Sequence, residues 1–278
     1  MGNRQTRLTI LVDNVPGDNE LSVEHGFSCC IGRGSSRIVF DTGQTGLVVQ
    51  NAGRLGEDLR SAESIVLSHG HYDHTGGLPC LFAEKVGVNL YAHPEAFCPK
   101  YVRDKDGKVR FIGIPVTISE VRNHIGIVWT LGPTEIAEGI HVTGPIPRTT
   151  NFEDTGGDFF ADETCRRPDL LLDDQALFWE SRNGLVVLLG CAHAGVVNTL
   201  NYVCRLMNNK RVHAVLGGMH LGSASRSRLE ATVESFRELD IKVIGSTHCT
   251  GSEVMAYLRD QMPDRYHDFR TGFVFELE

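Results

Sequence analysis

The chain has 278 residues, of which 41% are hydrophobic, and this size and composition argue for a folded globular protein and against disorder. Its formal charge is −8, from 27 Lys and Arg against 35 Asp and Glu, so the basic excess of a nucleic-acid-binding protein is missing. No stretch approaches the roughly 18 apolar residues of a membrane span, and the start turns polar too early for a secretory leader. We therefore expect a cytoplasmic protein without a membrane partner.

The first third of the chain alternates β-like runs with turns. The runs are "RLTILVDN" (7–14), "HGFSCCIG" (25–32) and "SRIVFDTG" (36–43), and a helix is predicted over 46–59. Each run is short and rich in β-branched or aromatic residues. This part of the chain therefore predicts a small sheet followed by a helix.

The stretch "SIVLSHGHYDHTGGL" (64–78) follows, and it crowds four potential metal ligands into six positions. Residues 64–67 predict a short buried strand, and Thr75 to Gly77 predict a turn that leads into a helix. His69, His71, Asp73 and His74 therefore lie at a strand end. Neighbouring imidazoles repel one another when charged and gain little from burial when neutral, so packing alone does not explain them. A divalent metal ion does.

Three later apolar runs also end near a histidine. "GLVVLLGCAHAG" (184–195) reaches His193, "HAVLGGMHLG" (213–222) reaches His220, and "IKVIGSTHCTG" (241–251) reaches His248. Helical spacing over 196–209 and 227–240 separates these strands, which predicts an α/β fold. Ligands in such folds gather beyond the carboxyl ends of the strands. His93 also ends a β-like run, but it precedes Pro94 and lies outside this pattern, so we interpret it as structural.

The HxHxDH motif and the histidines at later strand ends resemble the metallo-β-lactamase superfamily. This resemblance implies an αββα sandwich and a two-metal site. By the same resemblance, His69, His71 and His193 bind one ion, and Asp73, His74 and His248 bind the other. Zinc is the first expectation for both ions, with manganese or iron as alternatives, and each ligand set leaves room for water and substrate.

Many members of the superfamily supply a bridging aspartate between the last two strands, where this chain has "GGMHL" (217–221) without an acid. His220 is the candidate to replace it, as a ligand or through a hydrogen bond to the bridging hydroxide. The alternative is that the second ion binds weakly. We assign catalytic roles to Asp73 and His220. Asp73 would bind the second ion and orient the nucleophile through its free oxygen.

Several further stretches resemble one branch, the 7,8-dihydropterin-6-methyl-4-(β-D-ribofuranosyl)aminobenzene-5′-phosphate synthases. They are "VEHGFS" (23–28), "FDTGQTG" (40–46), "GPIPRTTNFE" (144–153), "GCAHAGVVNT" (190–199) and "THCTG" (247–251). The branch implies a phosphorylated, pterin-like small molecule as substrate. Two metal ions serve a transfer that releases diphosphate and the hydrolysis of a phosphate ester equally well, so both reactions stay open. The alternatives are a nuclease of the superfamily, against which the acidic charge argues, and a non-catalytic metal-binding protein.

The 124 positions between His69 and His193 exceed what one or two strand–helix units need, so we expect an insertion over the site at about 94–169. The chain is then a single domain, 1–278, with this segment as a lid. Within the lid, Arg148 and Asn151 are candidates to bind substrate oxygens, since a guanidinium fits a phosphate group.

Four further residues are weaker candidates. Cys191 and Cys249 stand near predicted ligands, but a role as small buried residues is the first expectation for both. Asp173 and Asp174 precede "QALFWE" (175–180), where they could orient an imidazole or form a turn at the strand edge.

Overall fold

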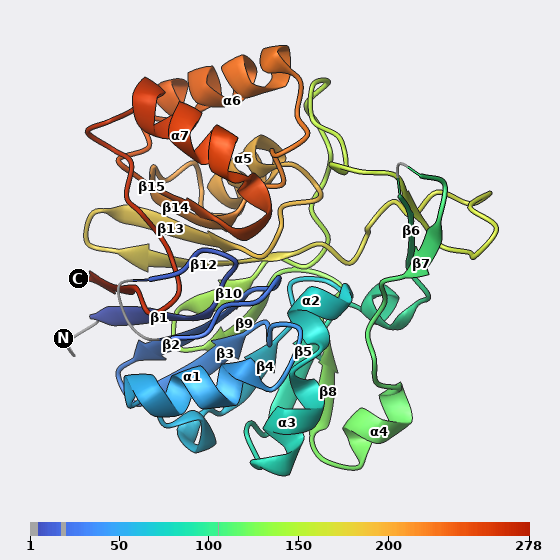
Figure 1. The fold of residues 1–278 in the computed structure, drawn as a ribbon. Coiled ribbons are helices and arrows are strands. Elements are labelled where there is room, and N and C mark those ends of the chain that lie inside the picture. Colours follow the sequence, from blue (N-terminus) through green and yellow to red (C-terminus); the bar gives the residue numbers. More distant parts are fainter. Residues whose placement is uncertain (1–4, 18–20, 105) are drawn as a thin grey trace.

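Two β-sheets pack face to face, and helices cover the outer surface of each (Figure 1). This computed structural model describes residues 5–17, 21–104 and 106–278. The layer order is helix, sheet, sheet, helix, which confirms the predicted αββα sandwich.

The first sheet has the strand order β16-β1-β2-β3-β4-β5-β8. Strands β3, β4, β5 and β8 run parallel, and helices connect them. The strands are Thr6–Val12 (β1), Ser28–Arg33 (β2), Ser36–Phe40 (β3), Ser64–Val66 (β4), Asn89–Ala92 (β5), Gly126–Trp129 (β8) and Val274–Leu277 (β16). The helical segments on this side are Leu47–Leu55 (α1), Leu59–Ser61 (η1), Leu78–Ala83 (α3) and Ile118–Arg122 (α4).

The second sheet has the order β15-β14-β13-β12-β10-β9. Its strands are Thr134–Ala137 (β9), Ile140–Val142 (β10), Ala176–Ser181 (β12), Gly184–Leu189 (β13), Val212–Gly218 (β14) and Val243–Thr247 (β15). Helices Val196–Leu206 (α5), Arg226–Glu238 (α6) and Ser252–Gln261 (α7) cover it. Because β13, β14 and β15 are parallel, their carboxyl ends meet at one edge, as the sequence predicts.

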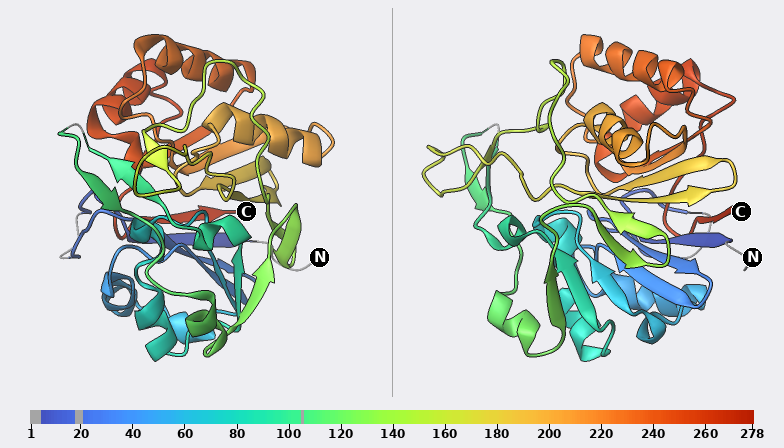
Figure 2. Two further views of the ribbon diagram at one scale, coloured as in Figure 1. Left: turned by 90° about the vertical axis from the view of Figure 1, so that its right-hand side faces the viewer. Right: turned by 180° about the vertical axis from the view of Figure 1, so that it is seen from behind.

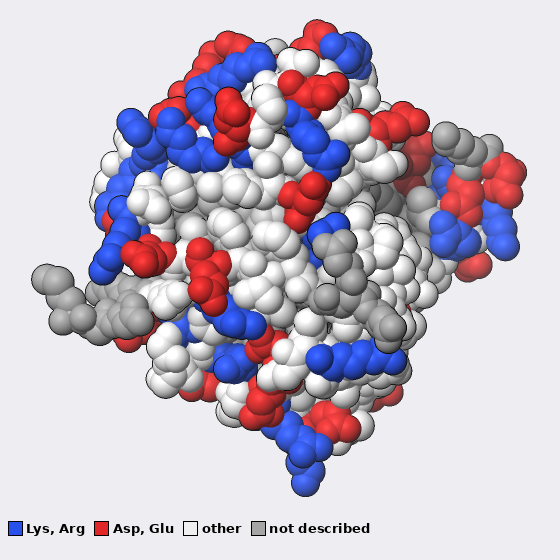
Figure 3. All heavy atoms as spheres, turned by 60° about the vertical axis from the view of Figure 1, so that its left-hand side comes forward, with Lys and Arg blue, Asp and Glu red and all other residues white. Residues whose placement is uncertain are grey.

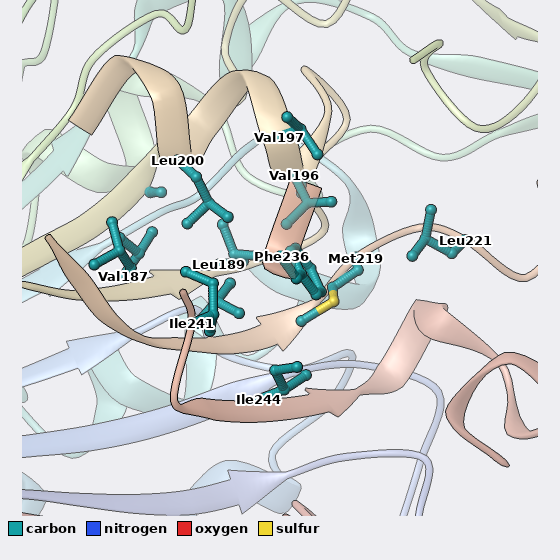
Figure 4. Close-up of a cluster of buried hydrophobic side chains, with 14 of the residues drawn as sticks. Val187, Leu189, Val196, Val197, Leu200, Met219, Leu221, Phe236, Ile241 and Ile244 are labelled. Atoms are coloured by element: carbon teal, nitrogen blue, oxygen red, sulfur yellow. The ribbon is translucent and has the colours of Figure 1, made fainter. Parts of the chain in front are cut away.

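Continuous apolar strands are needed because both faces of this sheet are buried. In β13, Val187 and Leu189 pack in a cluster with Leu200 of α5 and Phe236 of α6 (Figure 4). The alternate residues of the same strand pack against the first sheet. This double burial explains why the run shows no alternation of polar and apolar residues.

The predicted insertion at 94–169 is narrower in the structure. Strands β8, β9 and β10 lie inside this interval, yet they belong to the two main sheets. Outside the sandwich are a short helix, Pro94–Phe97 (η2), and a separate three-stranded sheet of Tyr101–Arg103 (β6), Val109–Phe111 (β7) and Phe159–Phe160 (β11). Figure 2 shows this sheet projecting from one side of the sandwich. Any lid is therefore limited to the segments around it; residue 105 lies outside the described residues.

The surface carries both signs of charge. On the face in Figure 3, basic and acidic side chains are interspersed over most of the surface, and basic side chains gather along the upper left edge. Over the whole chain, 35 acidic residues against 27 basic ones give the net charge of −8. Among the helices that the structure describes, none is long and apolar enough to cross a membrane.

Candidate metal centre

The HxHxDH motif runs from a strand end into a short helix. Strand β4 ends at Val66, and His71 directly precedes helix Tyr72–Thr75 (α2). Asp73 and His74 therefore lie on a helical turn. The helix expected after Gly77 is present as α3, but the four-residue α2 is too short to show a helical period in the sequence.

The later histidines reach the same place from the second sheet. His193 and His220 follow the ends of β13 and β14, and His248 opens the short helix His248–Thr250 (η3) after β15. His220 and His248 have φ angles of 45° and 51°, so the chain turns sharply directly after these strands. The three strand ends and the HxHxDH motif thus meet at one edge of the sandwich, with His69 packed against His193.

His69, His71 and His193 form a first group. His69 Nε2 lies 2.9 Å from His71 Nδ1. The ring centroid of His193 lies 4.7 Å from that of His69 and 4.9 Å from that of His71. All three side chains are buried, and Nε2 of His193 lacks a hydrogen-bond partner among the described residues. The family resemblance implied that these three histidines bind one ion, and the structure brings them together.

Asp73, His74 and His248 form a second group beside the first. His74 Nε2 and His248 Nε2 lie 3.1 Å apart. Asp73 Oδ2 lies 3.3 Å from His248 Nε2 and 3.7 Å from His74 Nε2. The ring centroids of His69 and His74 are 4.3 Å apart, so the two groups are in contact.

Outer hydrogen bonds orient several of these rings. His74 Nδ1 donates to Asp41 Oδ2 at 2.7 Å, and His193 Nδ1 donates to the Thr155 carbonyl at 2.8 Å. His69 Nδ1 lies 2.9 Å from Ser68 Oγ. Partners of this kind fix which ring nitrogen carries the proton, and they leave Nε2 facing the centre.

Asn14 fixes which ring nitrogen of His248 carries the proton. The backbone N–H of Gly26 donates to Asn14 Oδ1 at 3.0 Å, which identifies that atom as the amide oxygen. His248 Nδ1, 2.9 Å from the same oxygen, is therefore the donor. In a neutral His248 ring, Nε2 then carries the lone pair that faces His74.

This arrangement fits a metal ion. Both Nδ1 atoms donate outward, so in neutral His74 and His248 rings each Nε2 carries a lone pair. These two lone pairs would point at each other across only 3.1 Å. A proton or a metal ion must lie between them. The separations of 2.9 to 3.7 Å within the two groups match the spacing of ligands around an ion with bonds of about 2.0 to 2.1 Å.

Electrostatics favours the forms that bind metal. Burial lowers the pKa of His69, His71 and His193 well below the ordinary value, so these rings are neutral. Burial would raise the pKa of Asp73, but neighbouring imidazoles outweigh it and hold the pKa well below its usual range. Burial lowers the pKa of His74, but the carboxylates of Asp41 and Asp73 outweigh this effect and raise it to about 9. A metal ion would therefore displace a proton from His74 at neutral pH.

Sequence reasoning assigned no role to Asp41 or Asn14, and His25 entered it only as part of the stretch "VEHGFS" (23–28) that resembles the synthase branch. Asp41 directly follows β3, the parallel neighbour of β4, and this position was the available signal for an acid at the site. His25 Nε2 lies 3.2 Å from Asp73 Oδ2, and its side chain is 55% exposed, so it stands between the centre and solvent. An isolated histidine in a loop gives no sign of such a contact.

Asp173 and Asp174 hold backbone rather than an imidazole. Asp173 Oδ2 accepts from Gly70 N at 2.7 Å, inside the HxHxDH motif, and Asp174 Oδ2 accepts from Ala194 N at 2.7 Å, next to His193. Burial raises the pKa of Asp174 to about 7. The two acids therefore tie the two loops that carry the first histidine group to one short turn before β12.

Arg148 and Asn151 occupy the segment beside His193. The Arg148 guanidinium donates to the carbonyls of His193 at 2.8 Å and Leu170 at 2.6 Å. It therefore supports the loop that carries His193. Asn151 is exposed on the same segment. Their roles in substrate binding remain predictions.

His220 lies against the first group, with its ring centroid 4.4 Å from that of His193. Both ring nitrogens are buried. Phe159 of β11 adds an aromatic wall, 5.0 Å from the ring centroid of His71 and 5.2 Å from that of His193. The small sheet outside the sandwich thus reaches the centre through this ring. His93 is not part of the centre, because its Nδ1 accepts from Glu95 N and caps η2.

Comparison with known proteins agrees with the fold and the motif. The profile of the metallo-beta-lactamase superfamily matches residues 23–165. An uncharacterised protein of Methanocaldococcus jannaschii is 31% identical over 253 residues, covering 90% of this chain and 93% of its own. The 7,8-dihydropterin-6-methyl-4-(beta-D-ribofuranosyl)-aminobenzene-5'-phosphate synthase of the same organism is 27% identical, covering 91% and 90%. The crystal structure of a metal-dependent hydrolase of the beta-lactamase superfamily superposes with a TM-score of 0.83 at 30% identity, covering 97% and 98%.

The chain therefore belongs to the metallo-beta-lactamase superfamily. Within it, the relatives include a metal-dependent hydrolase and a pterin-related synthase.

Proposed function

We propose that this protein is a two-metal enzyme that acts on a phosphorylated, pterin-like small molecule. The reaction is either a group transfer that releases diphosphate or the hydrolysis of a phosphate ester. The observation that supports the metal centre most strongly is the approach of His74 Nε2 to His248 Nε2 at 3.1 Å, with each Nδ1 already donating outward. The substrate class is supported by the synthase relative, which resembles this chain over most of its length.

In this proposal, His69, His71 and His193 hold one divalent ion, and Asp73, His74 and His248 hold the other. Zinc is the first expectation because imidazole and carboxylate ligands suit it, and manganese or iron would also fit. When bound, such ions stabilise the negative charge that develops on phosphate oxygens. Beyond binding the ions, the protein then has to position the reacting groups and to provide a side chain that transfers a proton.

The chain's own residues would supply both. Asp73 binds an ion and, through its other oxygen, orients the attacking water or amine. His25 contacts Asp73 Oδ2 and is half exposed, so it is placed to exchange a proton between the centre and solvent. Phe159 offers its ring next to His71, where a planar heteroaromatic group would stack. Arg148 and Asn151 remain the candidates for contacts to substrate oxygens, and His220 for a catalytic role beside His193.

The segments around the small sheet of β6, β7 and β11 would form a lid on a single domain, 1–278. Such a lid would exclude water from the metal centre during the reaction. A nuclease is the second candidate, but the net charge of −8 argues against a protein that neutralises a phosphate backbone. A non-catalytic metal protein is the third.

The test is a product assay on the zinc- or manganese-loaded protein. A pterin diphosphate is supplied with and without an aryl amine, and an activated phosphodiester is supplied separately. Diphosphate release only with the amine supports transfer, and release with water alone supports hydrolysis. Asp73→Asn should lower turnover by ~10²-fold or more while the circular dichroism spectrum is unchanged. Turnover that survives both this substitution and metal removal would contradict the proposal.

A further inference from the structure

Cys191 is buried between the two histidine groups. It follows β13 by two residues, and its side chain is 2% exposed. The preceding Gly190 makes this position possible, because a Cβ there would lie 2.0 Å from Ser68 Oγ. Only glycine lets the chain after β13 come this close to the residue that precedes His69.

The sulfur of Cys191 is close to ligands of both predicted ions. Its Sγ lies 3.1 Å from His74 Nε2. Potential ligand atoms of Cys191, His69 and His193 lie within 4.8 Å of one another, and so do those of Cys191, His74 and His248. Among the described residues, Cys191 therefore belongs to two clusters of potential ligands. One contains histidines of the first group, and the other contains histidines of the second group.

Backbone conformation explains why a sequence argument gives Cys191 little weight. Ala192, between Cys191 and His193, has a φ of 54°, so this segment is a left-handed turn and not an extended strand end. The usual alternation of side-chain directions along a strand does not apply to it. The turn places both Cys191 and His193 at the centre.

We propose that Cys191, as a thiolate, is a ligand shared by the two metal ions. The thiol proton leaves to solvent when the ions bind, and the sulfur takes the place of the acid that is missing from "GGMHL". Thiolate is a normal zinc ligand with bonds of about 2.3 Å. This inference rests on the proposed two-metal centre.

Charge balance favours this assignment. Of the six side chains assigned to the ions, Asp73 alone carries a negative charge, while two divalent ions bring four positive charges into a buried site. A second anionic ligand at the point shared by both ions reduces this excess where it is largest. Asp41 already adds a negative charge behind His74, but it contacts the ring and does not face the centre.

Cys249 provides the matched control. It also lies beside a predicted ligand, His248, and near Cys191. However, its cluster contains Cys191 and His220 and none of the six side chains assigned to the two ions. Replacing Cys249 therefore removes a neighbouring thiol and leaves the shared position intact.

The test uses the full-length protein loaded with cadmium-113. Wild-type protein should bind two ions, and both cadmium resonances should fall in the thiolate-bound range, because a shared sulfur shifts both. Two bound ions with one thiolate-shifted resonance, or with none, would overturn the shared ligand but leave the two-metal centre standing. Fewer than two bound ions would instead contradict the centre itself.

Cobalt loading supplies the second arm. The thiolate-to-cobalt charge-transfer band should be present in wild type and Cys249→Ser and absent from Cys191→Ser. A band that persists in Cys191→Ser, or that disappears only in Cys249→Ser, would overturn the assignment. Should Cys191→Ser fail to fold, the cadmium spectrum of the wild-type protein still decides the question.

Discussion

Asp41 holds the imidazole of His74 through a 2.7 Å hydrogen bond between its Oδ2 and Nδ1, and both side chains are fully buried. The same carboxylate accepts from Ser68 N at 2.7 Å and from Ser68 Oγ at 2.6 Å. One acid at the end of β3 thus fixes the ring of a predicted ligand and the residue next to His69. Asp41 therefore forms hydrogen bonds next to the first histidine group, through Ser68, and to the second group, through His74.

Replacing this acid should weaken metal binding without removing a ligand. Asp41→Asn keeps the shape of the side chain but loses the charge that stabilises Nδ1–H of His74. We expect the affinity for the second ion to fall by about 10- to 100-fold. Competition titration with a chromogenic chelator measures this change. An affinity equal to that of wild type would show that Asp41 does not support the centre.

The metal-free protein should lose stability as the pH rises from about 6.5 to 9. The pKa of His74 is raised from 6.5 to about 9 in the folded state, so its contribution is fully present below 6.5 and is lost as the pH rises through 9. The contribution is on the order of 3 kcal/mol. Urea unfolding of the metal-free protein at several pH values measures it.

His74→Gln is the control for this titration. The metal-free variant lacks the titrating ring, so its free energy of unfolding should fall less over the same pH interval. Equal slopes in wild type and variant would contradict a protonated His74 that the carboxylates of Asp41 and Asp73 stabilise. Metal affinity should show the opposite trend in wild type and rise with pH, because the ion displaces this proton.

A buried lysine ties the small outer sheet to the HxHxDH motif. Lys100 is 1% exposed, and its Nζ donates to Asp173 Oδ1 at 2.9 Å and to Asp169 Oδ2 at 3.0 Å. Asp173→Asn removes the buried partner and should cost about 3 to 5 kcal/mol in the free energy of unfolding. Asp169→Asn should cost less, since Asp173 still pairs with Lys100. Equal losses in denaturant unfolding would show that Asp173 has no special role in holding this contact.

Glycine at position 156 allows the outer segment to lie against His220. Its φ is 83°, and a Cβ there would lie 2.1 Å from His220 Cδ2. Gly156→Ala should displace this segment, including the Thr155 carbonyl that accepts from His193 Nδ1, and should lower metal affinity by about 10-fold or more. Calorimetric titration with zinc measures the loss.

Gly107→Ala separates the steric contact from backbone strain. Gly107 has a similar φ of 85°, but its Cβ would meet no atom within 4 Å. Both variants carry the same conformational cost of about 1 kcal/mol or more. Only Gly156→Ala should change metal affinity. Equal effects on zinc binding would remove the contact with His220 from the explanation.

Repeated local patterns in the sequence predicted an α/β fold and the convergence of the histidines, whereas the αββα sandwich was predicted from the resemblance to the metallo-β-lactamase superfamily. Continuous apolar runs identify strands buried on both faces, and parallel strands bring residues such as His193 and His248 to one edge. The supporting residues were not predictable in this way. Asn14 reaches His248 across 234 positions, and Asp41 reaches His74 across 33, so neither contact leaves a local pattern.

Backbone geometry was the other missing information. The left-handed conformations at Ala192 and His248 occur in ordinary residues, and nothing in the sequence marks them. They decide where Cys191 and His248 lie. The extent of the insertion was overestimated for a related reason: β8 to β10 have only three or four residues each, and β8 and β10 join the main sheets through β5 and β12, which lie more than 30 positions away.

The central claim is that two metal ions lie in two adjacent ligand groups, and anomalous diffraction from crystals of the zinc-loaded protein tests it most directly. A difference map calculated from data at the zinc absorption edge should contain two peaks, one among His69, His71 and His193 and the other among Asp73, His74 and His248. A single peak, or peaks outside these six side chains, would contradict the account.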